Sequence, residues 1–125
     1  MQVTLSQGNE FHYTRKITRT DIIEFSRISG DQGIHHREGE KLLAHGLLVA
    51  TLPTKLGGDI NYIASDMHFK FLMPVYEEET ITCTARIEKI IEQKSRLKGW
   101  FSFECRNEQN EIVLKGSSFG MIWKN

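Results

Sequence analysis

An aspartate and a histidine five positions apart, Asp31 and His36, lie in a polar segment with two glycines and no regular hydrophobic period, DQGIHHREGE over residues 31–40. This composition predicts an exposed loop, and loops often carry functional side chains. A carboxylate and an imidazole that a short loop brings together can hold one water molecule, accept a proton from it and return a proton. The pair is therefore a candidate acid–base site, although each residue alone is more often a turn residue or a solvated surface group.

Gly46 follows His36 by ten positions and is expected at or near the start of a helix within the apolar segment LLAHGLLVATL, residues 42–52. A segment that is apolar almost all round predicts a helix enclosed on several sides. The first N–H groups of a helix have no acceptor inside it. The Gly46 N–H can therefore donate to an oxygen on which negative charge develops, which is the role of an oxyanion-hole donor.

The helices that position these residues are predicted from capping and breaking signals. Thr20 or Asp21 is expected to cap a helix that ends at Gly30, because glycine is common just after the last helical turn. Pro53 is expected to end or kink the apolar helix, and a turn is expected at residues 57–59.

The strands are predicted from alternating or β-branched patterns. Their order around the two helices predicts an α+β fold, in which a curled antiparallel sheet wraps around one central apolar helix. The predicted strands are residues 11–18, 60–71, 80–91, 97–106 and 112–123.

Composition limits the classes of partner. The chain has 125 residues, 16 Lys and Arg against 16 Asp and Glu, and 39% hydrophobic residues, which predicts one domain over residues 1–125. Balanced charge disfavours a nucleic acid partner. No apolar run reaches the roughly 20 residues that span a bilayer, so no membrane partner is expected.

The two cysteines, Cys83 and Cys105, are 22 positions apart and show no metal-ligand spacing. They are expected to be core thiols in a reducing cytoplasm, and no signal-peptide pattern precedes them. Neither a metal site nor a cofactor is predicted.

The motifs resemble those of the MaoC-like hot-dog family, which includes the (R)-specific enoyl-CoA hydratases. The family pattern SGDxNPxH is similar to SGDQGIHH over residues 29–36, its AHGM to AHGL over 44–47, and its FxxPV to FLMPV over 71–75. The resemblance implies a hot-dog fold. The chain differs from the family at Gly33 and Ile34, which replace Asn-Pro, and has a shorter segment between His36 and Gly46.

By position, the resemblance implies a catalytic dyad of Asp31 and His36, and an oxyanion donor at the Gly46 N–H. It implies that Thr54 stands where a family serine supports the dyad by hydrogen bonding, within the substrate-binding site. The implied reaction is addition of water to a trans-2-enoyl thioester to give an (R)-3-hydroxyacyl thioester, or the reverse dehydration, in fatty acid metabolism. The implied substrates are acyl-CoA or acyl-carrier-protein thioesters, and the implied assembly is a homodimer.

Two other functions remain open from the residues. In a hot-dog acyl-CoA thioesterase, the carboxylate would activate water toward the thioester carbonyl, and Asp31 and Gly46 would serve equally well. In a non-catalytic acyl-thioester-binding subunit, the Gly33 and Ile34 loop would no longer set the dyad. The basic residues Lys89, Lys94, Arg96 and Lys98 are candidates for binding CoA or carrier-protein phosphates, although such a run is more often a solvated hairpin.

Overall fold

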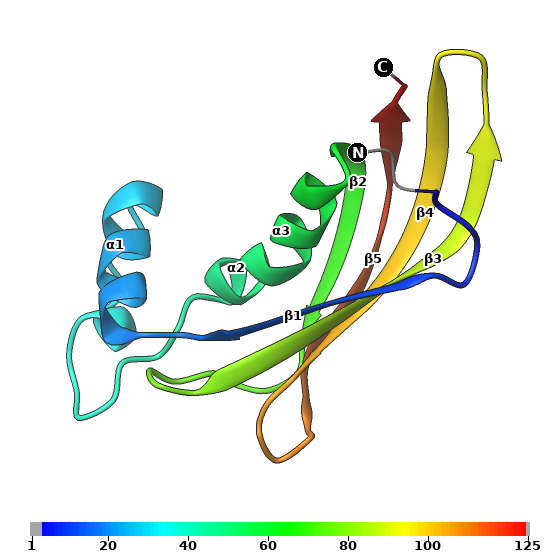
Figure 1. Cartoon of the computed structure of the whole chain (residues 1–125). Helices are drawn as coiled ribbons and strands as arrows, with labels where there is room; N and C mark the ends of the chain where they lie inside the picture. Colours follow the sequence, from blue (N-terminus) through cyan, green and yellow to red (C-terminus); the bar gives the residue numbers. More distant parts are fainter. Residues whose placement is uncertain (1–3, 125) are drawn as a thin grey trace.

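The computed structural model describes residues 4–124. Figure 1 shows the chain with its helices and strands labelled. In chain order the elements are β1 (Glu10–Lys16), α1 (Arg19–Ser29), the 3-10 helix η1 (Ile34–His36), α2 (Gly46–Val49), α3 (Thr51–Asp59), β2 (Tyr62–Phe71), β3 (Thr80–Glu92), β4 (Arg96–Arg106) and β5 (Ile112–Trp123). Among the helices of residues 4–124, none is long and apolar enough to cross a lipid bilayer.

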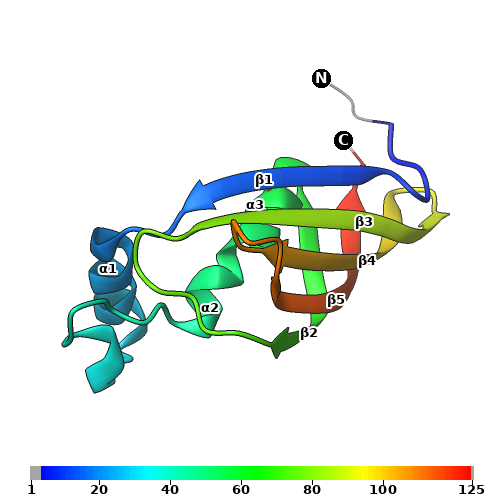
Figure 2. The same cartoon turned by 90° about the horizontal axis from the view of Figure 1, so that it is seen from below.

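The five strands form one antiparallel sheet in the order β1-β3-β4-β5-β2. The sheet is curled, and α2 and α3 lie against its concave face (Figures 1 and 2). In both views α1 lies beyond one end of the sheet, and the β3–β4 hairpin lies at the other end. This arrangement confirms the predicted α+β fold with a curled antiparallel sheet around an apolar helix.

The apolar stripe of α2 and α3 anchors these helices to the sheet. Leu48, Leu52 and Leu56 recur every four positions and lie in one buried cluster with inward-facing strand residues such as Cys83 and Leu114. Burial of each such side chain contributes about 1.5–3 kcal/mol. The helix is less enclosed than its sequence predicted, because Leu47 is 59% exposed in this chain.

The apolar helix begins at Gly46, which confirms that this glycine lies at the helix start, and residues 42–45 of the apolar segment precede the helix. The four preceding residues are held extended because they pair with the chain that follows β2. The Ala44 N–H donates to the Val75 carbonyl at 2.8 Å, and Leu43 forms an isolated antiparallel bridge with Tyr76. This pairing makes Gly46 the first helical residue, with its N–H outside the intrahelical ladder.

Pro53 does not end the helix. It lies in the first turn of α3, where a missing N–H removes no intrahelical hydrogen bond. The irregularity it was expected to cause is found at Ala50, which separates α2 from α3. The predicted turn at residues 57–59 is wrong, because α3 continues to Asp59 and the chain reverses at Asn61, which has a φ of 57°.

The start of α1 also differs from its prediction. Thr18, rather than Thr20 or Asp21, is the N-cap: its side chain accepts from the Asp21 N–H at 3.1 Å, and the Asp21 carboxylate accepts from the Thr18 N–H at 2.9 Å. The predicted end is confirmed, because Gly30 caps the helix with a φ of 77°, a conformation that glycine adopts readily. The chain therefore turns sharply just before Asp31.

Candidate active site

The loop after α1 holds the Asp31 carboxylate in a defined orientation. The Asp31 N–H donates to Ser29 Oγ at 3.0 Å, and Asp31 Oδ1 accepts from the Gly33 N–H at 3.1 Å. A Cβ at Gly33 would lie 3.3 Å from Asp31 Oδ1 and 3.4 Å from His36 Cδ2. The glycine that replaces the family's Asn thus leaves room between the two candidate catalytic side chains, and its N–H contacts the carboxylate.

The structure brings Asp31 and His36 together. Asp31 Oδ2 lies 3.6 Å from His36 Nε2, which is an ion-pair distance but longer than a hydrogen bond. The Asp31 side chain is 56% exposed and that of His36 is 14% exposed. Asp31 Oδ2 and His36 Nε2 therefore approach each other where a largely buried imidazole reaches the protein surface. A third polar group can contact both atoms there.

The tautomer of His36 follows from its second nitrogen. His36 Nδ1 lies 2.6 Å from the carbonyl oxygen of Leu43, and a carbonyl only accepts, so Nδ1 carries the proton. In return, the Leu43 N–H donates to the His35 carbonyl at 2.9 Å. In neutral His36 the Nε2 lone pair thus faces Asp31, which is the arrangement a general base requires.

A second histidine, His45, completes the cluster. It is 3% exposed, and its Nε2 lies 3.0 Å from Ser26 Oγ and 3.2 Å from the Asp31 carbonyl oxygen. Its ring stacks on that of His36, with centroids 3.6 Å apart and planes 16° from parallel. Burial lowers the pKa of His45, so the neutral form is favoured. His45 was not among the site residues predicted from the sequence, where it appeared only within the AHGL motif. The one further signal in the sequence was that His45 is a polar residue inside an apolar segment.

The side chains of Asp31, His36 and His45 each bring one ligand atom within 4.8 Å of the others, which is close enough to consider a metal ion. An imidazole binds a metal through a lone pair in its ring plane, at about 2.0–2.1 Å for zinc. Two stacked, nearly parallel rings leave no common point in both planes at that distance. The geometry therefore favours acid–base chemistry over metal binding.

Gly46 lies next to this cluster because it directly follows His45. Its N–H has no hydrogen-bond acceptor within residues 4–124. The ring of Phe71 packs against it so closely that a Cβ at Gly46 would lie 2.7 Å from Phe71 Cε1. Leu43, Met73 and neighbouring apolar residues surround the same groove. A donor beside apolar side chains is suited to an oxygen that is sheltered from water.

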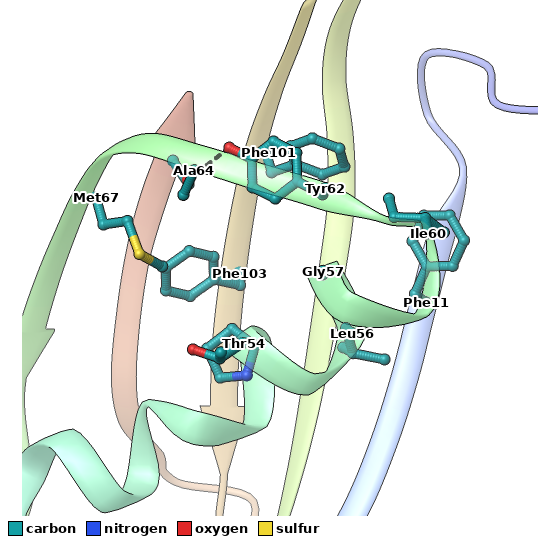
Figure 3. Close-up of a pocket in the computed structure, with 13 residues that line it drawn as sticks. Phe11, Thr54, Leu56, Gly57, Ile60, Tyr62, Ala64, Met67, Phe101 and Phe103 are labelled. Atoms are coloured by element: carbon teal, nitrogen blue, oxygen red, sulfur yellow. Dashed lines mark hydrogen bonds between the residues drawn. The ribbon is translucent and has the colours of Figure 1, made fainter. Parts of the chain in front are cut away.

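The structure does not bring Thr54 to the dyad. Its hydroxyl donates to the Ala50 carbonyl at 3.0 Å, one turn back in the same helix, so the expectation that it hydrogen-bonds to the dyad is wrong for this chain. Thr54 is part of the wall of a pocket of about 130 Å³ between α3 and the concave face of the sheet. In Figure 3, Thr54 faces the space below the ring pair of Tyr62 and Phe101.

The pocket is mainly apolar, and three residues with hydroxyl groups, Thr54, Tyr62 and Ser118, line it. The Tyr62 hydroxyl lies 2.6 Å from Ser118 Oγ, which donates to the Asp66 carbonyl at 2.9 Å. Burial raises the pKa of Tyr62, so its phenol stays protonated and donates to Ser118. The lining residues are Phe11, Pro53, Thr54, Leu56, Gly57, Ile60, Tyr62, Ala64, Met67, Ala85, Phe101, Phe103 and Ser118.

The basic run that was a candidate phosphate-binding site is remote from the dyad. Lys89, Lys94, Arg96 and Lys98 lie in or beside the β3–β4 hairpin, at the end of the sheet opposite α1 (Figure 2). Lys89 lies over the ring of Trp100 at 5.1 Å. Within one chain, this hairpin therefore belongs to the solvated surface rather than to the candidate site.

Comparison with known proteins identifies relatives by structure only. No protein-family model and no curated protein sequence matches the chain. The R-hydratase PhaJ1 from Pseudomonas aeruginosa superposes with a TM-score of 0.84 and 19% identity, over 97% of this chain and 83% of that chain. A MaoC-like dehydratase from Rhodospirillum rubrum gives 0.79 and 15%, over 97% and 94%.

A third structure, the C-terminally truncated HadBC 3R-hydroxyacyl-ACP dehydratase complex from Mycobacterium tuberculosis, gives a TM-score of 0.73 and 17% identity, over 94% of this chain and 98% of that chain. Each comparison covers at least 94% of this chain and at least 83% of the other, while identity is low. The similarity therefore shows a shared fold, and the chemistry rests on this chain's own residues.

Proposed function

We propose that this chain, whose fold is that of the MaoC-like hot-dog hydratases and dehydratases, adds water to trans-2-enoyl thioesters to give (R)-3-hydroxyacyl thioesters, or catalyses the reverse dehydration. The observation that carries the proposal is the 3.6 Å approach of Asp31 Oδ2 to His36 Nε2, beside the Gly46 N–H, which has no acceptor in the described part of the chain. An acid–base pair and an oxyanion donor are the two requirements of this reaction.

Hydration begins with one water molecule between Asp31 and His36. As the water oxygen forms a bond to C3 of the enoyl group, one of the two side chains accepts the water proton, and the C2–C3 π electrons move toward the thioester carbonyl. The Gly46 N–H donates to the carbonyl oxygen as it becomes negative. The proton then returns to C2, the carbonyl is restored, and both side chains regain their starting charge. Dehydration is the same path in reverse.

The fixed tautomer of His36 supports this role. Its Nδ1–H is engaged with the Leu43 carbonyl at 2.6 Å, so only Nε2 is available to exchange a proton with water. The pocket beside Thr54 supports an acyl ligand, because its wall is mainly apolar and includes residues of α3, the helix that follows α2 in the chain. An acyl-CoA or acyl-carrier-protein thioester fits these two features.

The proposal is tested by incubating the purified protein with crotonyl-CoA and longer trans-2-enoyl-CoA esters. The conjugated thioester absorbance should fall without release of free CoA thiol, and chiral analysis should identify the (R)-3-hydroxyacyl product. Cys83 and Cys105 are fully buried, and a hydrogen bond with Cys83 together with burial raises the pKa of Cys105, so the protein's own thiols should not react with the thiol reagent.

Thiol release without loss of the double bond would instead assign a thioesterase. Binding of acyl-CoA without turnover would assign a non-catalytic subunit. Either result on the full substrate panel, including carrier-protein thioesters, would overturn the proposed hydration.

We also propose that the chain is a cytoplasmic homodimer that uses the outer edge of β2. Within residues 4–124, β2 has β5 as its only strand neighbour. Exposed apolar side chains lie along and after it: Ile63 is 60%, Phe71 53% and Leu72 48% exposed. A long apolar edge strand left open favours pairing with another chain.

The proposed dimer can be tested by a substitution at the outer edge of β2. Ile63→Lys should reduce the mass measured by light scattering from that of two chains toward that of one, since it places a charge beside the pairing edge. Ile28→Lys is the matched control, because Ile28 is 80% exposed on α1, away from β2. A wild-type chain of monomeric mass would contradict the proposal, and so would equal behaviour of the two variants.

A further inference from the structure

His45 joins the two halves of the candidate dyad. Its Nε2 lies 3.2 Å from the main-chain carbonyl oxygen of Asp31, and its ring face lies on the ring of His36 at 3.6 Å. The residue after it is Gly46, whose N–H is the candidate oxyanion donor. One buried side chain therefore contacts both members of the dyad and adjoins the third functional group.

The protonation of His45 follows from its partners. The Asp31 carbonyl can only accept, so a hydrogen bond to it requires the proton on Nε2. Ser26 Oγ, at 3.0 Å from the same nitrogen, then acts as a second acceptor or a close polar neighbour. His45 Nδ1 has no partner among the described residues, and an unpaired ring nitrogen is less costly as a lone pair than as an N–H donor.

The neutral state of His45 matters for its neighbour. If His36 is the base, its ring gains a second proton and becomes positively charged during turnover. A positive charge on His45, whose ring stacks on that of His36 at 3.6 Å, would oppose this protonation. Burial lowers the pKa of His45 and so disfavours that second charge; the titratable groups that face it are His36 and Asp31. Phe25 closes the remaining side with an edge-on contact at 4.9 Å.

We propose that His45 is a positioning residue for the dyad: its Nε2–H holds the Asp31 main chain, and its ring fixes the plane of His36. This inference rests on the proposed hydration for its kinetic test. It differs from a purely structural role because the two contacts are separable, one depending on the N–H group and the other on the flat ring.

Three variants distinguish the hydrogen bond to the Asp31 carbonyl from the ring contact with His36. His45→Gln keeps an N–H group that can reach the Asp31 carbonyl but loses the ring, His45→Phe keeps a flat ring but loses the donor, and His45→Leu loses both. We expect His45→Leu to lower kcat for crotonyl-CoA hydration about 100-fold, which is the effect of displacing a catalytic group by about 1 Å. The Gln and Phe variants should each lose less than Leu, with KM changed less than kcat in all three.

A remote substitution and a folding measurement accompany the series. His68→Leu is the control for loss of a histidine, because the His68 side chain is 75% exposed and its nearest charged partner is Asp66. Circular dichroism and thermal melting identify variants that are unfolded. Full kcat in a folded His45→Leu variant, or equal losses in all three variants, would overturn the positioning role.

A readout without substrate keeps this inference separate from the proposed reaction. Nitrogen-15 NMR of the imidazoles should find the wild-type protein with His45 as the Nε2–H form and His36 as the Nδ1–H form. In His45→Leu, the His36 signals should shift toward a mixture of tautomers, while His45→Phe should preserve them. If the wild-type protein hydrates no enoyl thioester, the reaction is wrong but these spectra still decide the role of His45. Unchanged His36 spectra in His45→Leu would reject it.

Discussion

Asn in place of Asp31 is expected to lower kcat for enoyl-thioester hydration by about 10²–10⁴-fold, the usual contribution of one acid–base group. The carboxamide has the size of the carboxylate, and its oxygen can still accept from the Gly33 N–H that holds Asp31 Oδ1 at 3.1 Å. The substitution therefore removes the negative charge and the proton acceptor while leaving the loop intact. Steady-state kinetics with crotonyl-CoA measures the loss.

His36→Asn is the companion change. Its amide N–H can replace Nδ1–H as the donor to the Leu43 carbonyl, whereas the nitrogen that faces Asp31 is lost. A decrease in kcat of similar size is expected, and the double variant should lose little more than either single one, because residues that act as one unit are not additive.

Asp59→Asn is the matched control for the loss of a carboxylate. The Asp59 side chain is 50% exposed, close to the 56% of Asp31, and pairs with Lys55 at the end of α3. Its activity should equal that of the wild type. Hydration that survives in both Asp31→Asn and His36→Asn, with correctly folded proteins, would remove the dyad from the mechanism.

The second large effect is expected at Gly46. Gly46→Pro removes the N–H proposed to stabilise the oxyanion, and the loss of one such donor typically lowers kcat by about 10²–10³-fold. The backbone can accept proline here, because Gly46 is the first residue of α2 and His45 before it has φ −63° and ψ 140°, a conformation that suits a residue preceding proline.

Gly46→Ala separates the missing N–H from the added carbon. Both variants place a Cβ against the ring of Phe71, at 2.7 Å before any adjustment. Only proline lacks the N–H. Comparing kcat for the two, alone and in a Phe71→Leu background that relieves the contact, isolates the contribution of the donor. Equal activity of the Ala and Pro variants would mean that the Gly46 N–H does not bind the carbonyl oxygen.

The sheet and the dyad loop were predictable because their signals are local. Alternation along β4 places Phe101 and Phe103 in the core, and glycine at position 30 ends α1 as its conformational freedom predicts. The extended conformation of residues 42–45, before the apolar helix, was not predictable in this way. It depends on the hydrogen bond from the Ala44 N–H to Val75, a residue about thirty positions away, which no local propensity contains.

The same reason explains Thr54 and His45. A hydroxyl group in a helix can bond to its own preceding turn, as Thr54 does with Ala50, and sequence does not tell which partner it chooses. His45 acquires its contacts from Ser26 on α1 and from the Asp31 main chain, so its position depends on how α1 and α2 meet. Residue types were evident from the sequence, while their pairing came from the tertiary structure.

Two hydrogen bonds join His35 and His36 to Leu43, and together they bound a short surface loop. They close the chain at both ends of residues 37–41, all of which are exposed. The length of that segment can therefore vary without moving the imidazole that it follows. Grafting a longer segment between these anchors should leave the dyad in place, which makes residues 37–41 an insertion point for variants that add chain beside His36 and alter substrate preference.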